Sequence, residues 1–177
     1  MLLGAKKMAF LGLLLAWAVL LVVLSGILEF NTLFLLAGAS FCVGIAIREC
    51  GLRLGVGFLI GSALLSFILA PNKFYCITFS GMGLYLVVVE FTWEKLAMIT
   101  WCKKRNRIFW VLKLIIFNCI YIPIILFFPE FIIPGKMSKG FLAVLLLGGQ
   151  LVLIIYDQAY RYFQKTIWGK LRGYLHI

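Results

Sequence analysis

The sequence has very little of the chemistry that enzymes use. Its 177 residues include one histidine, His176, which stands next to the last residue. Nucleophilic catalysis by Ser–His or Cys–His pairs and metal sites built on histidines both need that side chain. No glycine-rich phosphate loop follows an expected strand, because no strand is expected. The sequence therefore favours a protein that is not an enzyme and that carries no cofactor.

Cysteine gives no sign of a metal centre or a disulfide framework. The five cysteines are odd in number, and no two of them stand in a Cys-x-x-Cys pair. Both kinds of site need closely spaced pairs. Cys42 and Cys119 lie inside apolar segments, where cysteine commonly behaves as a small apolar residue. We therefore expect structural roles for these cysteines and no metal site.

Acidic residues are scarce, at 6 against 17 Lys and Arg, and the formal net charge is +11. Such a surplus can indicate binding to the phosphate backbone of a nucleic acid. Here the basic residues stand at the ends of apolar segments, where anionic cytoplasmic lipid attracts each of them by about 1 kcal/mol. No stretch remains that could fold into a soluble nucleic-acid-binding domain. The sequence therefore predicts the lipid bilayer as a partner and no nucleic acid.

Apolar sequence is what the chain has in abundance. Hydrophobic residues make up 64% of it, and its mean hydropathy is +1.11. A membrane-spanning helix needs about 20 residues, because the hydrocarbon core is about 30 Å thick. Segments of about that length lie at about 8–28, 32–47, 54–70, 74–92, 108–128 and 140–160. The sequence therefore predicts an all-α, polytopic six-helix transmembrane bundle in the cell membrane. Its expected parts are a single domain over 1–160 and a basic, aromatic cytoplasmic tail over 161–177.

The distribution of basic residues predicts the orientation of this bundle. Thirteen of the 17 lie before the first segment, after the last one, or in every second connection between segments. Three lie in the other connections, and Lys113 lies inside a segment. Basic residues near span ends are retained on the cytoplasmic side. Both termini are therefore expected in the cytoplasm, and the first span is too long to be a cleaved signal peptide.

Small residues and two amphipathic segments each allow two interpretations. The second and third spans are rich in glycine and alanine, which favours close helix packing, although a cavity would use the same residues. The connection 93–107 and the tail 161–177 combine basic and aromatic residues. Such segments usually lie at the lipid surface, and docking of a cytoplasmic protein is the alternative.

Charged side chains inside the apolar segments are costly in lipid, so each needs a partner or a function. Glu90, Lys113 and Asp157 lie at similar depth, near the expected cytoplasmic boundary. Lys113 is expected to pair with a carboxylate of the fourth or sixth span, or to extend its ammonium group along its own helix toward water. A proton or ion relay would use the same groups. The sequence favours pairing or extension over a relay.

Two amides near the middle of the membrane predict a second contact. Asn118 lies near the middle of the fifth span, and Gln150 lies at a corresponding depth in the sixth. An amide without a partner is penalised in an apolar medium, so we expect the two side chains to hydrogen-bond to each other. Contacts of this kind contribute about 0.6–2 kcal/mol.

Polar residues at the expected outer side are the groups that could meet a solute from outside. If the chain binds a substrate, the candidates are Glu29, Asn31, Asn72, Lys73, Tyr75 and, deeper in the fourth span, Tyr85. The alternative is that the outer polar residues cap the helices of two tight hairpins. The sequence favours capping.

Two stretches between 65 and 130 have a distinctive sequence. Leu65–Lys73 reads LSFILAPNK and Trp110–Asn118 reads WVLKLIIFN, with Gly83-Leu84-Tyr85 and Glu90 between them. In this pattern the chain resembles a group of small, uncharacterised bacterial integral membrane proteins, a resemblance that implies no known activity. The signature positions it implies are Pro71, Lys73, Tyr85, Lys113 and Asn118.

The first span carries two small-residue spacings, Ala5-x-x-x-Ala9 and Gly12-x-x-x-Ala16. With six spans and cytoplasmic termini, the chain is similar to the substrate-binding S components of energy-coupling-factor vitamin transporters. That similarity implies a subunit for small-solute binding or uptake, docked through these spacings on a transmembrane partner. A rod-shape morphogenesis scaffold subunit is similar in size and span number, and it implies a non-transporting scaffold or accessory subunit. The first hypothesis requires an outward cavity, and the second requires an exposed face or a docking tail.

Overall fold

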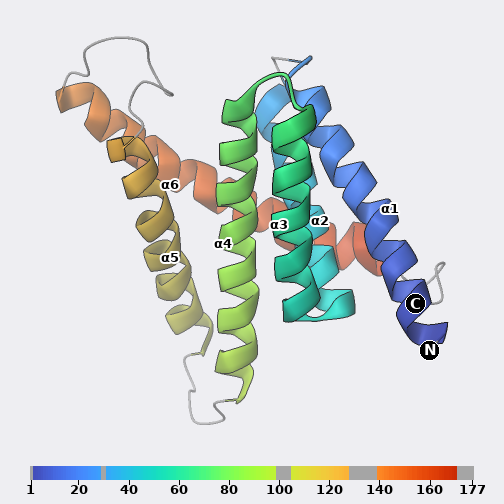
Figure 1. Ribbon diagram of the computed structural model, residues 1–177. Helices are drawn as coiled ribbons and strands as arrows, with labels where there is room; N and C mark the ends of the chain where they lie inside the picture. The colour runs from blue at the N-terminus through green and yellow to red at the C-terminus, as the bar shows by residue number, and fades with distance from the viewer. Residues whose placement is uncertain (1, 29–30, 99–104, 128–138, 171–177) are drawn as a thin grey trace. The chain divides into compact units, whose positions relative to one another are not determined.

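The computed structural model describes residues 2–28, 31–98, 105–127 and 139–170 (Figure 1). Within these ranges the chain is helical apart from short turns, which confirms the predicted all-α class. The helices are α1 (Leu2–Ser25), α2 (Thr32–Cys50), α3 (Leu52–Leu69), α4 (Lys73–Met98), α5 (Arg105–Phe127) and α6 (Lys139–Tyr162). A short π-helix, Phe163–Trp168, continues α6 into the segment that was expected to be a tail.

Four of these helices are long and apolar enough to cross a membrane. The qualifying segments are Gly4–Ser25, Thr32–Cys50, Leu52–Leu69 and Lys73–Leu96. A helix satisfies its own backbone hydrogen bonds, which lipid requires because it offers no partners. Large apolar side chains such as Leu13, Phe34 and Ile68 are exposed on these helices. The four helices are therefore compatible with an integral membrane protein.

The chain forms two compact units, Met1–Glu94 and Lys95–Ile177. The first unit contains α1, α2, α3 and most of α4. The second contains α5, α6 and the π-helix. Each unit has its own set of internal contacts, so each is described separately.

The first unit is built on close approach of helices through small side chains. Ala18 of α1 and Ala39 of α2 are completely buried in its core, together with Phe79 of α4. Gly55 of α3 is buried against Ile47 of α2, and a Cβ atom on Gly55 would lie 2.3 Å from Cγ1 of Ile47. The close packing predicted from small residues is therefore present at Gly55.

Gly51 makes the whole connection between α2 and α3. Its φ angle is 91°, a conformation that glycine adopts without the steric cost that a Cβ atom brings. Its N–H donates a 2.8 Å hydrogen bond to the carbonyl of Ile47, which ends α2. Two antiparallel helices thus follow each other with a single residue between them.

Candidate functional site: the polar contacts between α5 and α6

A buried ion pair joins the two long helices of the second unit. Lys113 of α5 donates from Nζ to Oδ1 of Asp157 of α6. Lys113 is 4% exposed and Asp157 is 2% exposed. Two charges removed from water in this way stay ionised only if they neutralise each other closely. The sequence left the acid partner of Lys113 open between the fourth and sixth spans, and the structure has a partner in α6.

A second cation and two aromatic rings surround this pair. Nε of Arg161 lies 3.2 Å from Oδ2 of Asp157, one helical turn away on α6. The Arg161 guanidinium lies 5.2 Å from the ring centre of Trp110, and Nζ of Lys113 lies 4.5 Å from that of Phe109. A cation over an aromatic face gains roughly 0.5–2 kcal/mol. The cluster thus holds two cations on one carboxylate with aromatic support from α5.

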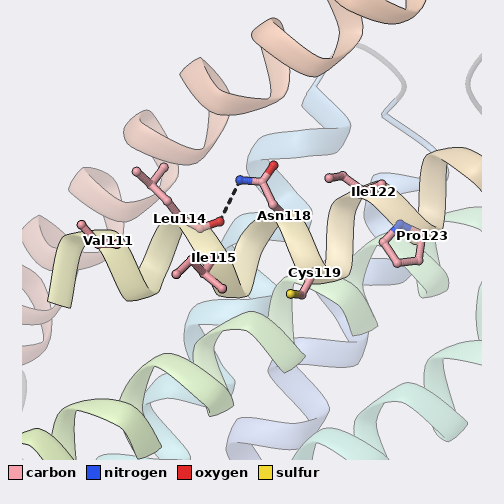
Figure 2. Close-up of a pocket in the computed structure, with 7 residues that line it drawn as sticks. All are labelled: Val111, Leu114, Ile115, Asn118, Cys119, Ile122 and Pro123. Carbon is pink, nitrogen blue, oxygen red and sulfur yellow. Dashed lines mark hydrogen bonds between the residues drawn. The ribbon is translucent and has the colours of Figure 1, made fainter. Parts of the chain in front are cut away.

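Asn118 and Gln150 form the hydrogen bond that their depth in the sequence predicts. Nε2 of Gln150 donates to Oδ1 of Asn118 at 2.8 Å. Nδ2 of Asn118 donates in turn to the carbonyl oxygen of Leu114 at 2.8 Å, as the dashed line in Figure 2 shows. The Asn118 amide therefore uses both its acceptor and its donor group, and it links α5 to α6.

Tyr121 supplies a third link, which the sequence analysis missed. Its hydroxyl donates a 3.0 Å hydrogen bond to the carbonyl oxygen of Leu145 in α6. The ring lies so close to Gly149 that a Cβ atom there would be 2.4 Å from Cε1 of Tyr121. The signal that could have found this contact is the Gly148-Gly149 pair at the depth of an aromatic residue on the preceding helix.

These three links lie in antiparallel order along the two helices. As the chain runs back along α5 from Tyr121 through Asn118 to Lys113, the partners advance along α6. The arrangement fixes the register of the helices with side-chain and backbone hydrogen bonds rather than with a large apolar core. Chemically it offers one carboxylate, two cations and amides, which can hold charge and bind an anion.

A shallow groove of about 570 Å³ runs along α5 (Figure 2). Its lining residues recur every three or four positions and so share one side of the helix: Val111, Leu114, Ile115, Asn118, Cys119, Ile122 and Pro123. The Asn118 amide is the only amide side chain among them. This lining provides mainly apolar contact, with one amide, Asn118, and one exposed thiol, Cys119.

Glu90 has a partner that the sequence analysis did not assign. Nε and Nη2 of Arg48, in the last turn of α2, donate to Oε1 of Glu90 on α4 at 2.9 and 2.7 Å. Both residues belong to the first unit. The second span was expected at 32–47, which ends before Arg48, whereas α2 continues to Cys50 and brings Arg48 within reach of α4.

The described residues proposed to bind a substrate, apart from Tyr85, lie next to the α1–α2 and α3–α4 connections. Glu29 lies outside the described residues, and Asn31 is exposed just before α2. Oδ1 of Asn72 accepts a 3.0 Å hydrogen bond from the backbone N–H of Phe74. Nζ of Lys73 donates to the carbonyls of Ala70 and Phe67 at the end of α3. Asn72 and Lys73 therefore make the capping contacts that the alternative interpretation predicts.

The two tyrosines of this set are separated along α4. Tyr75 is half-buried and packs against the core of the first unit, whereas Tyr85 is buried. At about 1.5 Å per residue, Tyr85 lies about 15 Å farther along the helix axis than Tyr75. The structure brings Asn72, Lys73 and Tyr75 together, but not Tyr85.

Among the described residues, no group of three or more His, Cys, Asp and Glu side chains could hold a metal ion. Comparison of the chain with known protein families, curated proteins and solved structures found no match.

Proposed function

We propose that the chain is a six-span integral membrane protein with both termini in the cytoplasm, and that it acts as a non-transporting accessory or scaffold subunit. The four long apolar helices support residence in the membrane. The alternation of basic residues supports the orientation. The similarity in size and span number to a rod-shape scaffold subunit is consistent with this role.

The observation that carries the role of a subunit in a larger assembly is an exposed row of small residues on α1. Ala5, Ala9, Gly12 and Ala16 recur every three or four positions, and all four are exposed. No atom outside the helix lies within 4 Å of the Cβ position of Gly12. Elsewhere on the same helix, Ala18 and Val22 are completely buried in the core. Small residues allow two helix backbones to approach closely in lipid. The row therefore suits a transmembrane partner helix.

The outer hairpins support a scaffold rather than a solute-uptake subunit. An uptake subunit requires the outer polar groups to converge on a cavity. Asn72 and Lys73 instead hydrogen-bond to the backbone of α3 and α4. Their side chains stabilise the hairpin, and this role does not depend on a ligand.

The test measures the size of the native assembly that contains the chain. Gly12→Leu fills the small-residue row of α1, so we expect the complex to shift toward the free protein on native electrophoresis of mildly solubilised membranes. Gly57→Leu is the matched control, because Gly57 is an exposed glycine of α3 with nothing within 4 Å of its Cβ position. It is expected to leave the complex intact.

Two results would contradict the proposal. One is an assembly whose size is the same in the wild type and in Gly12→Leu. The other is a rise in the melting temperature of the purified wild-type chain with a vitamin or small metabolite, which would favour solute uptake.

A further inference from the structure

One end of the second unit carries far more positive than negative charge. Within residues 95–98, 105–127 and 139–170, Asp157 is the only acidic side chain. Its carboxylate forms ion pairs with two cations, Lys113 at Oδ1 and Arg161 at Oδ2. One carboxylate neutralises one cation, so the cluster retains about one unit of positive charge. Net positive charge near a membrane surface attracts anions, including anionic lipid headgroups.

Arg161 is the member of the cluster that can reach such an anion. Its side chain is 50% exposed, whereas that of Lys113 is 5% exposed. Its Nε lies 3.2 Å from Oδ2 of Asp157 in an ion pair without a hydrogen bond, and its guanidinium lies over the ring of Trp110. A guanidinium has five N–H donors, and stacking on an aromatic ring restrains its plane. The half-exposed guanidinium therefore has N–H donors left for a ligand.

Two more exposed cations lie one helical turn from Arg161 or from its partner Trp110. Lys165 follows it by one turn in the π-helix, and Arg107 precedes Trp110 by one turn in α5. Tryptophan is enriched at the level of lipid headgroups. We propose that Arg161, assisted by Lys165 and Arg107, binds the phosphate of an anionic phospholipid at the expected cytoplasmic face. Arginine can donate two parallel hydrogen bonds to a phosphate, and basic sites on transmembrane helices bind acidic lipid headgroups.

The proposal stands apart from the scaffold function, because it rests on α5 and α6 and not on α1. The purified full-length chain in neutral detergent is titrated with phosphatidylglycerol and, separately, with phosphatidylcholine, and bound lipid is counted by native mass spectrometry. We expect phosphatidylglycerol to bind more tightly. Arg161→Gln and Lys165→Gln are each expected to weaken it by about fivefold, the factor that corresponds to roughly 1 kcal/mol per cation at a lipid surface.

Arg53→Gln is the matched control, since it removes an exposed cation from the first unit on the same expected face. It is expected to change the affinity by less than about twofold. Equal losses of phosphatidylglycerol affinity in all three variants would show that lipid binding depends only on total charge. That result would overturn the proposed site. Lys165→Gln keeps the test valid if Arg161→Gln does not fold, because Lys165 is outside the Asp157 cluster.

A separate arm distinguishes the source of the phosphate. Inorganic phosphate carries the same chemistry without the acyl chains, so sodium phosphate is added to the chain loaded with phosphatidylglycerol. We expect the lipid to stay bound. Displacement by inorganic phosphate would overturn the lipid as ligand and identify a soluble anion. Equal affinity for phosphatidylcholine would overturn the requirement for a net negative headgroup.

Discussion

At the scale of single residues, the Lys113–Asp157 pair determines how charge is tolerated in the second unit. Each charge alone would be costly to bury, and each compensates the other. Arg161 adds a second, exposed contact to the same carboxylate. The removal of one partner therefore has a larger effect than the removal of both, because it leaves the other charge buried.

Lys113→Met is expected to lower the stability of the chain in detergent by roughly 3 kcal/mol, since it leaves Asp157 without its buried cation. Asp157→Asn is expected to destabilise as well, and the double variant should be less destabilised than the sum of the two. Thermal unfolding of the four proteins gives the coupling energy. Lys170→Met, which removes an exposed cation, is the control and should change little. Additive effects of the two substitutions would show that Lys113 extends to water without pairing.

At the scale of helices, α5 and α6 combine polar links with one very close apolar approach. The close approach is at Gly149, where the ring of Tyr121 occupies the space of a side chain. Gly148 is its neighbour in sequence but faces open space, with nothing within 4 Å of its Cβ position. Substitution of each glycine in turn therefore separates the effect of packing against Tyr121 from the effect of helix propensity.

Gly149→Ala is expected to destabilise the chain by about 1–3 kcal/mol, because the added methyl group overlaps Tyr121 and displaces its hydroxyl from Leu145. Gly148→Ala is expected to be neutral, or stabilising by up to about 1 kcal/mol, because alanine is the better helix former. Thermal unfolding in the same detergent measures both. If the two variants melt at the same temperature, the packing of the Tyr121 ring does not require a glycine at position 149.

The helices could be predicted because lipid makes length and hydropathy decisive, and the sequence predicts a helix close to each of the six. Helix ends were predicted less well. Because α2 continues to Cys50, Arg48 reaches Glu90. The expected end of the second span at residue 47 leaves Arg48 outside the helix, so this contact was not predicted. In the candidate site, the Asn118–Gln150 bond follows from depth alone. The hydrogen bond from Tyr121 to Leu145 is harder to predict, because its acceptor is a backbone carbonyl and only the glycine pair at 148–149 points to the close approach of the ring.

At the scale of the whole molecule, the number of spans and the side of the termini are separate questions. Six spans would place both termini on one side. If only the four qualifying helices crossed and α5 and α6 stayed on one side, the termini would again share a side. Helix α5 has 23 residues, a length of about 34 Å, which matches the hydrocarbon core of about 30 Å. The connection between α5 and α6 is therefore the position that distinguishes the two topologies.

Reporter fusions along the chain test the orientation and the number of spans together. Fusions after residues 30, 72 and 135 are expected to report the outer compartment, and fusions after 50, 105 and 177 the cytoplasm, because basic residues concentrate in the second set of connections. Alkaline phosphatase, active only outside, and a fluorescent protein, active only inside, give opposite readouts at each position. A cytoplasmic signal at 135, with outer signals at 30 and 72, would reduce the spans to four. Outer signals at 50 and 105 would invert the orientation. The predicted topology requires all six positions to agree.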